Sequence, residues 1–405
     1  MSIVILVFLI YILKYKLEKL SPKSRNNILI YFLFGIFIIC VFNLYVEYCV
    51  GWKYGVPFDD DSSWIFKAAE SMKKGSKWSE LYLLVSRSWD LTNRVLSPAN
   101  IGQYIYAKFV SLCLYYPVII DLHVNIYILY LIQFILITTA IIDVILELES
   151  LGKSYYKKNS SKSIVFFLIL FYPMIIFNAG KMLRETIYTY FMFEMFVCFL
   201  HYLNNAESKE KIKKMIIYTL LMLLFRPNSV IIVIPLFIWM FLGDEMAIII
   251  NLIIMGIVTL GALIINWIMQ IAGWSYSFGD VSIYEVIHLL LFPNIFNQIK
   301  DFMYIFSEPS WQTVVYFFQS FWNIIFIVIM LVGMVFAKNK KYTLVFLTML
   351  LNALFIYSIA YGIENFTPRY KLIYIIPQIY FVYTGLCFMK SKFKLRLTIK
   401  SQALK

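Results

Sequence analysis

The chain has 405 residues, of which 61% are hydrophobic, 19% aromatic and 15% charged, and its mean hydropathy is +0.77. Average soluble chains are about 45–50% apolar and about 25% charged. This composition excludes a soluble enzyme, a disordered chain and a secreted disulfide scaffold, and it indicates a multi-pass protein of the cell membrane. The net charge of +13 calls for no nucleic-acid partner, because Lys and Arg collect in the cytoplasmic loops of membrane proteins.

Apolar runs of about 20 residues cross a bilayer as helices. Ten candidates occur, at 28–50, 121–146, 163–178, 184–203, 215–225, 228–242, 246–269, 314–337, 342–361 and 372–389. An eleventh run, 2–13, is short and is a brief span or an interfacial anchor. The runs 163–178 and 215–225 are also short, and they extend into polar flanks or stop at a break. The predicted fold is therefore all-α, a bundle of about ten or eleven transmembrane helices forming a single domain over 1–405.

The distribution of Lys and Arg predicts the orientation of this bundle. If 14–27 is cytoplasmic, alternation also places 149–162, 204–214, 338–341 and 390–405 inside. These five segments hold 22 of the 36 basic residues in only 59 residues, as expected for the cytoplasmic side. Two long external segments result, 51–118 and 270–313. Loops this long are usually functional or contain helices of their own.

The first external loop carries three adjacent carboxylates, Asp59, Asp60 and Asp61, just after a membrane helix. Three neighbouring negative charges are unfavourable without a partner, which would be a metal, a cationic side chain or an acceptor hydroxyl that loses its proton. The alternative is that the cluster is only a solvated helix cap. Helical spacing of apolar residues follows over 62–74 and again over 100–114, which predicts two helices on the membrane surface.

Five external basic residues cluster at the ends of predicted spans, namely Lys181, Arg184, Arg226, Arg369 and Lys371. Charged groups at membrane depth are costly and tend to be functional, although Lys and Arg at helix ends also simply reach lipid headgroups. Arg226 precedes Pro227, which breaks a helix, and a broken helix at this depth usually lines a cavity. We predict that Asp60, Arg184, Arg226 and Arg369 line one pocket at the outer membrane edge. Glu185 is either an internal salt-bridge partner or a second acid.

In their order and spacing, these features resemble the GT-C glycosyltransferases, membrane enzymes that use polyprenyl-phosphate-linked sugars. The first long helix is followed by the acidic pair Asp60-Asp61, with Trp64 four residues after the first acid and Ala68 four further on. The later matching stretches are Lys181-Met-Leu-Arg184-Glu185, Leu224-Phe-Arg226-Pro227-Asn228 and Glu364-Asn-Phe-Thr-Pro368-Arg369-Tyr370-Lys371. The chain departs from the family pattern in having Asp for the usual second Glu and Trp for the usual Tyr.

The resemblance implies an inverting transfer of a sugar from a polyprenyl-(di)phosphate donor to a glycan or lipid acceptor on the outer face, in cell-surface polysaccharide assembly. It implies Asp60 as the general base and Asp61 as its neighbour or a metal ligand. The groups that it places around the lipid phosphate are Lys181, Arg184, Glu185, Arg226, Arg369 and Lys371. A divalent metal on Asp61 or Glu185 is left open, and no other cofactor is expected. The expected partners are the lipid-linked sugar, its acceptor and membrane lipids.

Two other functions compete with the transferase. A repeat-unit polymerase for capsule or O-antigen also joins polyprenyl-diphosphate-linked glycans and shares the span number and the external Arg residues. The external Asp cluster favours the transferase over the polymerase. A flippase or transporter of lipid-linked sugar ranks third, because transporters often show inverted repeats with matching helix breaks, whereas this sequence has one clear Arg-Pro break and no repeat.

Overall fold

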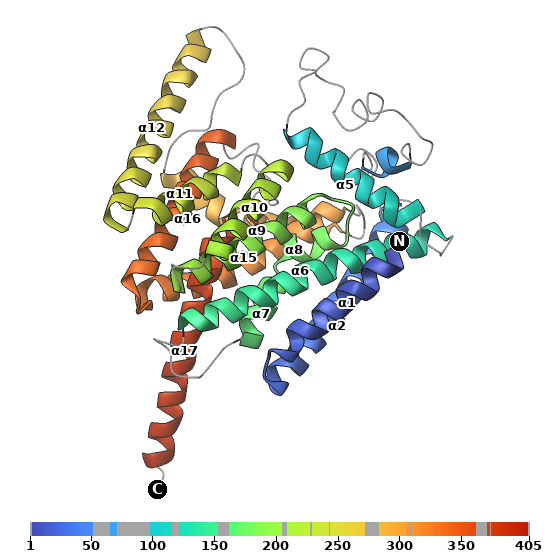
Figure 1. The fold of residues 1–405 in the computed structure, drawn as a ribbon, viewed down its shortest axis with the longest axis horizontal. Coiled ribbons are helices and arrows are strands. Elements are labelled where there is room, and N and C mark those ends of the chain that lie inside the picture. Colours follow the sequence, from blue (N-terminus) through green and yellow to red (C-terminus); the bar gives the residue numbers. More distant parts are fainter. Residues whose placement is uncertain are drawn as a thin grey trace. The chain divides into compact units, whose positions relative to one another are not determined.

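The computed structural model describes residues 2–51, 65–70, 98–115, 121–152, 162–204, 209–226, 229–242, 244–271, 283–305, 307, 310–361, 371–372 and 374–403. Over these residues the protein is all-α and contains no strand, which confirms the predicted fold class (Figure 1). Each predicted apolar run coincides with helical segments. Helices suit such runs because backbone polar groups inside a bilayer have to be satisfied within their own segment.

Among the described residues, four helices have the length and hydropathy of a membrane span. They are α2 (Pro22–Tyr48), α6 (Leu122–Gly152), α9 (Glu185–Asn204) and α15 (Trp311–Phe336). The pair α7 (Lys162–Leu170) and α8 (Pro173–Ala179) has these properties jointly and gives a fifth if it is one bent span. The described helices are thus consistent with a multi-pass membrane protein. Crossing by the remaining predicted runs stays a prediction.

Contacts within the chain divide it into two compact units. The first comprises Met1–Glu147, Lys162–Asn228 and Tyr304–Val315, and the second comprises Leu148–Ser161, Ser229–Met303 and Tyr316–Lys405. One boundary falls in the break after α10, two residues beyond Arg226. The prediction of a single membrane domain over the whole chain stays a prediction.

The first unit contains α1 (Ser2–Glu18), α2, α5 (Pro98–Tyr115), most of α6, and then α7, α8, α9 and α10 (Lys209–Phe225). A tight turn joins α1 to α2, where the Ser24 amide donates to the Ser21 hydroxyl at 3.4 Å and Pro22 occupies the first turn. The helices α9 and α10 pack against each other as an extended pair (Figure 1). The short predicted run 215–225 extends into its polar flank, because α10 begins at Lys209.

The predicted run 163–178 bends instead of crossing as one straight helix. α7 ends at Leu170, Pro173 occupies the first turn of α8, and the two helices meet at 62°. Proline has no amide hydrogen and its ring clashes with the carbonyl four residues earlier, so it favours a break between α7 and α8 and suits the first turn of α8. All seven residues of α8 are buried. A break in a helix is tolerated at membrane depth where protein surrounds the backbone. The turn that follows α8 starts from such a buried helix.

α5 has the helical extent predicted over 100–114, and its place on the membrane surface stays a prediction. One face packs against α10, with Tyr106, Ala107 and Val110 fully or almost fully buried. Gly102 permits this packing, since a Cβ atom there would overlap the carbonyl oxygen of Leu224. Ile105, on the predicted apolar face, is exposed.

The second unit contains α11 (Val230–Leu242), α12 (Asp244–Ile271), α13 (Ile283–Leu291), α14 (Ile295–Met303), most of α15, α16 (Lys340–Tyr361) and α17 (Ile375–Ala403). α16 contacts α11, α12, α13 and α17. The Asn352 side-chain amide donates to that of Asn251 on α12 at 3.1 Å. α13 and α14 lie within the predicted external segment 270–313, which therefore contains helices of its own.

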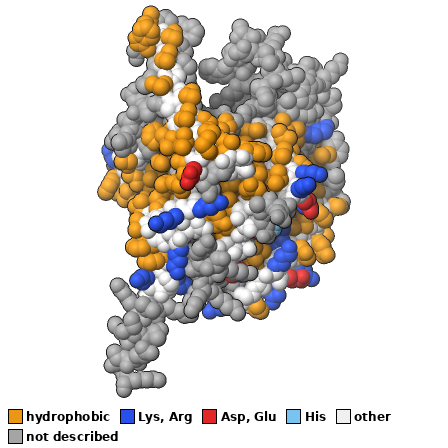
Figure 2. All heavy atoms as spheres, turned by 60° about the vertical axis from the view of Figure 1, so that its left-hand side comes forward, with side chains coloured by type: hydrophobic (Ala, Val, Ile, Leu, Met, Phe, Trp, Pro, Cys, Tyr) orange, Lys and Arg blue, Asp and Glu red, His pale blue; other side chains and the backbone are white. Residues whose placement is uncertain are grey.

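Large apolar side chains cover much of the molecular surface (Figure 2). On α12 they recur at helical spacing, as Ile249, Leu252, Ile253, Ile257, Leu260, Ile264, Trp267 and Ile268, each about half exposed or more. A continuous stripe of this kind is unfavourable in water and favourable against lipid. The surface thus agrees with the span assignment from hydropathy.

Candidate functional site: a basic turn and a buried charge cluster

Four of the predicted site residues come together at one end of the α9–α10 pair. Lys181 and Arg184 lie in the turn between α8 and α9, Glu185 is the first residue of α9, and Arg226 directly follows α10. Because the two helices run in opposite directions along their contact, the start of α9 lies beside the end of α10. The Arg226 guanidinium donates through Nη2 to Glu185 Oε1 and forms an ion pair.

This ion pair is buried in the first unit. The Glu185 side chain is 2% exposed and that of Arg226 is 13% exposed. A carboxylate in the first turn of a helix is also favoured by the helix dipole. Glu185 therefore acts as a salt-bridge partner, one of its two predicted roles, although its partner is Arg226 and not its neighbour Arg184.

The turn before α9 is fixed by hydrogen bonds and by an aromatic ring. The amide of Lys181 donates to the Asn178 carbonyl at 3.2 Å, and the Thr186 hydroxyl donates to the same oxygen at 2.9 Å. Lys181 itself is 2% exposed, and its ammonium lies over the ring of Trp311. A cation over an indole face is stabilised by the ring quadrupole. The Trp311 ring is therefore already occupied by a cation.

Tyr106 of α5 adds a hydroxyl to the same region. Burial raises the pKa of the Tyr106 hydroxyl well above its usual value, and the neighbouring Tyr130 and Glu185 raise it further. Tyr106 is thus a neutral hydrogen-bonding group at neutral pH. Sequence analysis missed it, because a tyrosine in an aromatic-rich membrane protein carries no distinguishing signal.

Among the described residues at this turn and at the adjoining end of α10, Lys181, Arg184 and Arg226 are cations and Glu185 is a carboxylate. Arg presents five donors in a planar fork that suits phosphate oxygens, so one guanidinium can pair with a carboxylate and still offer N–H groups to an anion. The arrangement has the chemistry of a site for a phosphate-bearing ligand.

Three predicted site residues, Asp60, Asp61 and Arg369, lie outside the described residues. The predicted pocket of Asp60, Arg184, Arg226 and Arg369 therefore stays a prediction. Among the residues that the structure does describe, no group of three or more His, Cys, Asp or Glu could hold a metal ion. Glu185, the other proposed metal ligand, already pairs with a guanidinium and so fits a metal poorly.

Lys371 belongs to the second unit, where its side chain caps the C-terminal end of helix α13. It is 1% exposed, and its ammonium donates to the Leu290 carbonyl at 2.9 Å near the C-terminal end of α13. The Tyr374 hydroxyl donates to the adjacent Leu289 carbonyl at 3.0 Å. The last carbonyls of a helix have no partner within it, and a cation there is favoured by the dipole. The pKa of His288 on α13 is lowered, mainly by burial and to a lesser extent by the positive charge of Lys371.

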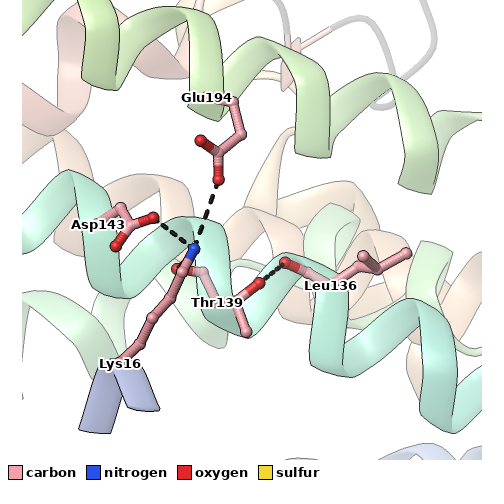
Figure 3. Close-up of polar contacts among 5 residues, drawn as sticks. All are labelled: Lys16, Leu136, Thr139, Asp143 and Glu194. Atoms are coloured by element: carbon pink, nitrogen blue, oxygen red, sulfur yellow. Dashed lines mark hydrogen bonds and ion pairs between the residues drawn. The ribbon is translucent and has the colours of Figure 1, made fainter. Parts of the chain in front are cut away.

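A second charged cluster, not predicted as a unit from the sequence, lies inside the first unit (Figure 3). Lys16 of α1 forms an ion pair with Asp143 of α6, and its Nζ lies 3.7 Å from Glu194 Oε1 of α9. The same ammonium donates to the Thr139 carbonyl at 3.4 Å. Glu194 therefore faces the protein interior, as expected for an acid in the middle of a span. A lysine near the end of one apolar helix, with acids deep in two others, is the signal that would have indicated the cluster.

Comparisons with protein-family models, with curated protein sequences and with solved structures found no match to this chain.

Proposed function

We propose that the protein is an integral membrane glycosyltransferase that moves a sugar from a polyprenyl-(di)phosphate donor to a glycan or lipid acceptor on the outer face. The observation that supports this most is the group of basic residues where α9 begins and α10 ends: Arg226 pairs with the buried Glu185, and Lys181 and Arg184 lie in the turn just before Glu185. A phosphate at the end of a lipid chain is the ligand whose charge and depth fit such a turn.

In the proposed reaction, the acceptor hydroxyl oxygen forms a bond to the anomeric carbon while the bond from that carbon to the phosphate oxygen breaks. The electron pair leaves with the polyprenyl (di)phosphate, and the acceptor proton goes to a carboxylate. Arg184 and Arg226 offset the negative charge that develops on the leaving phosphate, an electrostatic contribution that is often the largest in such transfers. Asp60 is the proposed base, by its resemblance to the acidic motif of the family.

The test has a binding arm and an activity arm. Purified protein in nanodiscs is titrated with polyprenyl monophosphate, and Arg226→Gln and Arg184→Gln are expected to weaken binding, whereas Lys209→Gln, an exposed lysine on predicted cytoplasmic surface, is not. Surface polysaccharide is then measured in cells that lack the native protein and carry each variant. Asp60→Asn is expected to lower the rate about 10²–10⁴-fold, as for loss of a general base, and Asp59→Asn to have a milder effect.

A matched control for Asp60 is Asp121→Asn. Asp121 is exposed at the start of α6, where it accepts a hydrogen bond from the His123 amide at 2.8 Å, and Asn caps a helix about as well. If Asp59, Asp60 and Asp61 all tolerate Asn while Arg184 and Arg226 are essential, the transferase gives way to the repeat-unit polymerase. Full activity of the arginine variants, with unchanged binding of the lipid phosphate, would contradict both.

A further inference from the structure

The Lys16–Asp143–Glu194 cluster has one cation for two carboxylates. Lys16 directs its hydrogen bonds to Asp143 and to the Thr139 carbonyl. Glu194 forms the second and longer ion pair with the same ammonium, at 3.7 Å, and its buried Oε1 accepts no hydrogen bond from the described residues. The two acids are therefore not equivalent: Asp143 holds the lysine, and Glu194 is the surplus acid (Figure 3).

Burial makes a surplus charge costly at this position. Glu194 is 8% exposed, within a helix that has the hydropathy of a membrane span. A buried ionised carboxylate that shares its cation with a second, closer acid and accepts no hydrogen bond is unfavourable, so the group is more stable when neutral. If all three groups were ionised, the cluster would carry a net charge of −1. One bound proton makes it neutral and leaves the Lys16–Asp143 pair intact.

The other groups that face Glu194 do not supply the missing cation directly. Tyr190 of α9 and Tyr218 of α10 lie close to both acids and are neutral hydroxyls at neutral pH. Cys198, one turn along α9, is likewise neutral there. Lys211 of α10 acts on Glu194 through longer-range electrostatics, and no ion pair between them occurs in the described structure. α8, which also packs against α9, carries no titratable side chain, and Glu147 of α6 contacts His201, two turns along α9 from Glu194.

We propose that this cluster is a proton-binding site in which Glu194 carries the proton at neutral pH. Binding converts the Glu194 carboxylate and one proton from solution into a neutral carboxylic acid, with no other reactant. The site is separate from the basic turn, since Glu194 lies nine residues along α9 from Glu185, or about 14 Å at the rise of an α-helix. It therefore holds whether or not the glycosyltransferase proposal does.

The experiment is infrared spectroscopy of the reconstituted full-length protein at neutral pH, in which a protonated carboxyl gives a carbonyl band separate from that of a carboxylate. Glutamate labelled with ¹³C at the side-chain carboxyl shifts the band only if it belongs to a Glu. We expect a band that shifts with the label in the unmodified protein and is lost in Glu194→Gln. Because the first measurement needs no substitution, a variant that fails to fold does not remove the test.

Two further variants separate this assignment from an unrelated protonated acid. In Asp143→Asn, Lys16 has only Glu194 to pair with, so Glu194 ionises and the band is lost. In Lys16→Gln both acids lack their cation, so a second band appears that the glutamate label does not shift. Glu210→Gln, at the exposed Glu210–Lys214 pair on α10, is the matched control and leaves the band unchanged. Absence of a label-sensitive band in the unmodified protein, or its persistence in Glu194→Gln, would overturn the proposal.

Discussion

Glu185 and Arg226 are 41 residues apart in the sequence and form a buried ion pair where α9 begins and α10 ends. The pair connects the start of α9, just after the turn that follows α8, to the residue that follows α10. One charge interaction thus holds these two helix ends together. The positions of Lys181 and Arg184 depend on the same contact, since both lie within the turn that precedes Glu185.

A double-mutant cycle on this pair measures the interaction. Glu185→Gln and Arg226→Gln each leave one buried charge without its partner, and each is expected to lower the free energy of unfolding by about 3–5 kcal/mol. The double variant removes both charges, and its free energy of unfolding is expected to fall by less than the sum of the two single decreases. Thermal unfolding in detergent, followed by loss of the monodisperse protein, provides the readout.

Glu210→Gln is the matched control for this cycle. It breaks an ion pair at 2.6 Å on the same helix pair, but both partners are largely exposed, so little change in unfolding temperature is expected. Strict additivity of Glu185→Gln and Arg226→Gln would mean that these residues do not interact.

Substitution at Gly102 tests the packing of α5 against α10. In Gly102→Ala the new methyl group overlaps the Leu224 carbonyl, which is part of the backbone and cannot rotate away. The free energy of unfolding is therefore expected to fall by about 1–3 kcal/mol. Gly256→Ala on α12 is the control, because its Cβ meets nothing within 4 Å and Ala is the better helix former by about 1 kcal/mol. Equal stabilisation by both substitutions would show that α5 lies away from α10.

Native cysteines provide a test of the orientation. Cys49 is exposed just beyond the end of α2 that is predicted to be external, Cys40 is half-buried, and Cys113, Cys198 and Cys387 are buried. A membrane-impermeant maleimide is therefore expected to label intact cells once per chain, and Cys49→Ser is expected to abolish the label. In that background, Lys209→Cys should react only after permeabilisation. Labelling at position 209 in intact cells would reverse the predicted topology.

Two substitutions at Lys371 separate helix capping from phosphate binding. Lys371→Leu leaves the Leu290 carbonyl without its donor and is expected to lower the free energy of unfolding by about 1–3 kcal/mol. Lys371→Gln retains an amide donor and is expected to cost less. The unfolding temperatures of the two variants check this order. Equal stability accompanied by equal loss of lipid-phosphate binding would instead assign the ammonium to the ligand.

Much of the fold could be predicted because its cause is local. Apolar runs specify helices wherever the backbone has to satisfy its own hydrogen bonds, and the runs indeed coincide with helices. The short length of the run 163–178 was one reason to expect a break, and the chain does bend there, at Pro173. Helix ends were predicted less well where polar residues continue the helix, as at Lys209.

Side-chain partnerships could not be predicted, because they depend on how distant helices align. Glu185 was recognised as a salt-bridge partner or second acid, but only the antiparallel packing of α9 and α10 selects Arg226 over the adjacent Arg184. Likewise, the buried face of α5 depends on a close approach at Gly102 that hydrophobic spacing does not encode. The positions of helices along the chain follow from the apolar runs, whereas contacts between side chains depend on how the helices pack in space.

The position of Lys16 has a consequence for biosynthesis. Its partner Asp143 is 127 residues farther along the chain, and at about 5–20 residues per second the ribosome needs about 6–25 s to reach it. Throughout that interval the first helix carries an ammonium that has no acid to pair with, which opposes its settling into the membrane interior. We therefore expect α1 to dock only after α6 has been made, and a nascent chain released before Asp143 to leave α1 undocked.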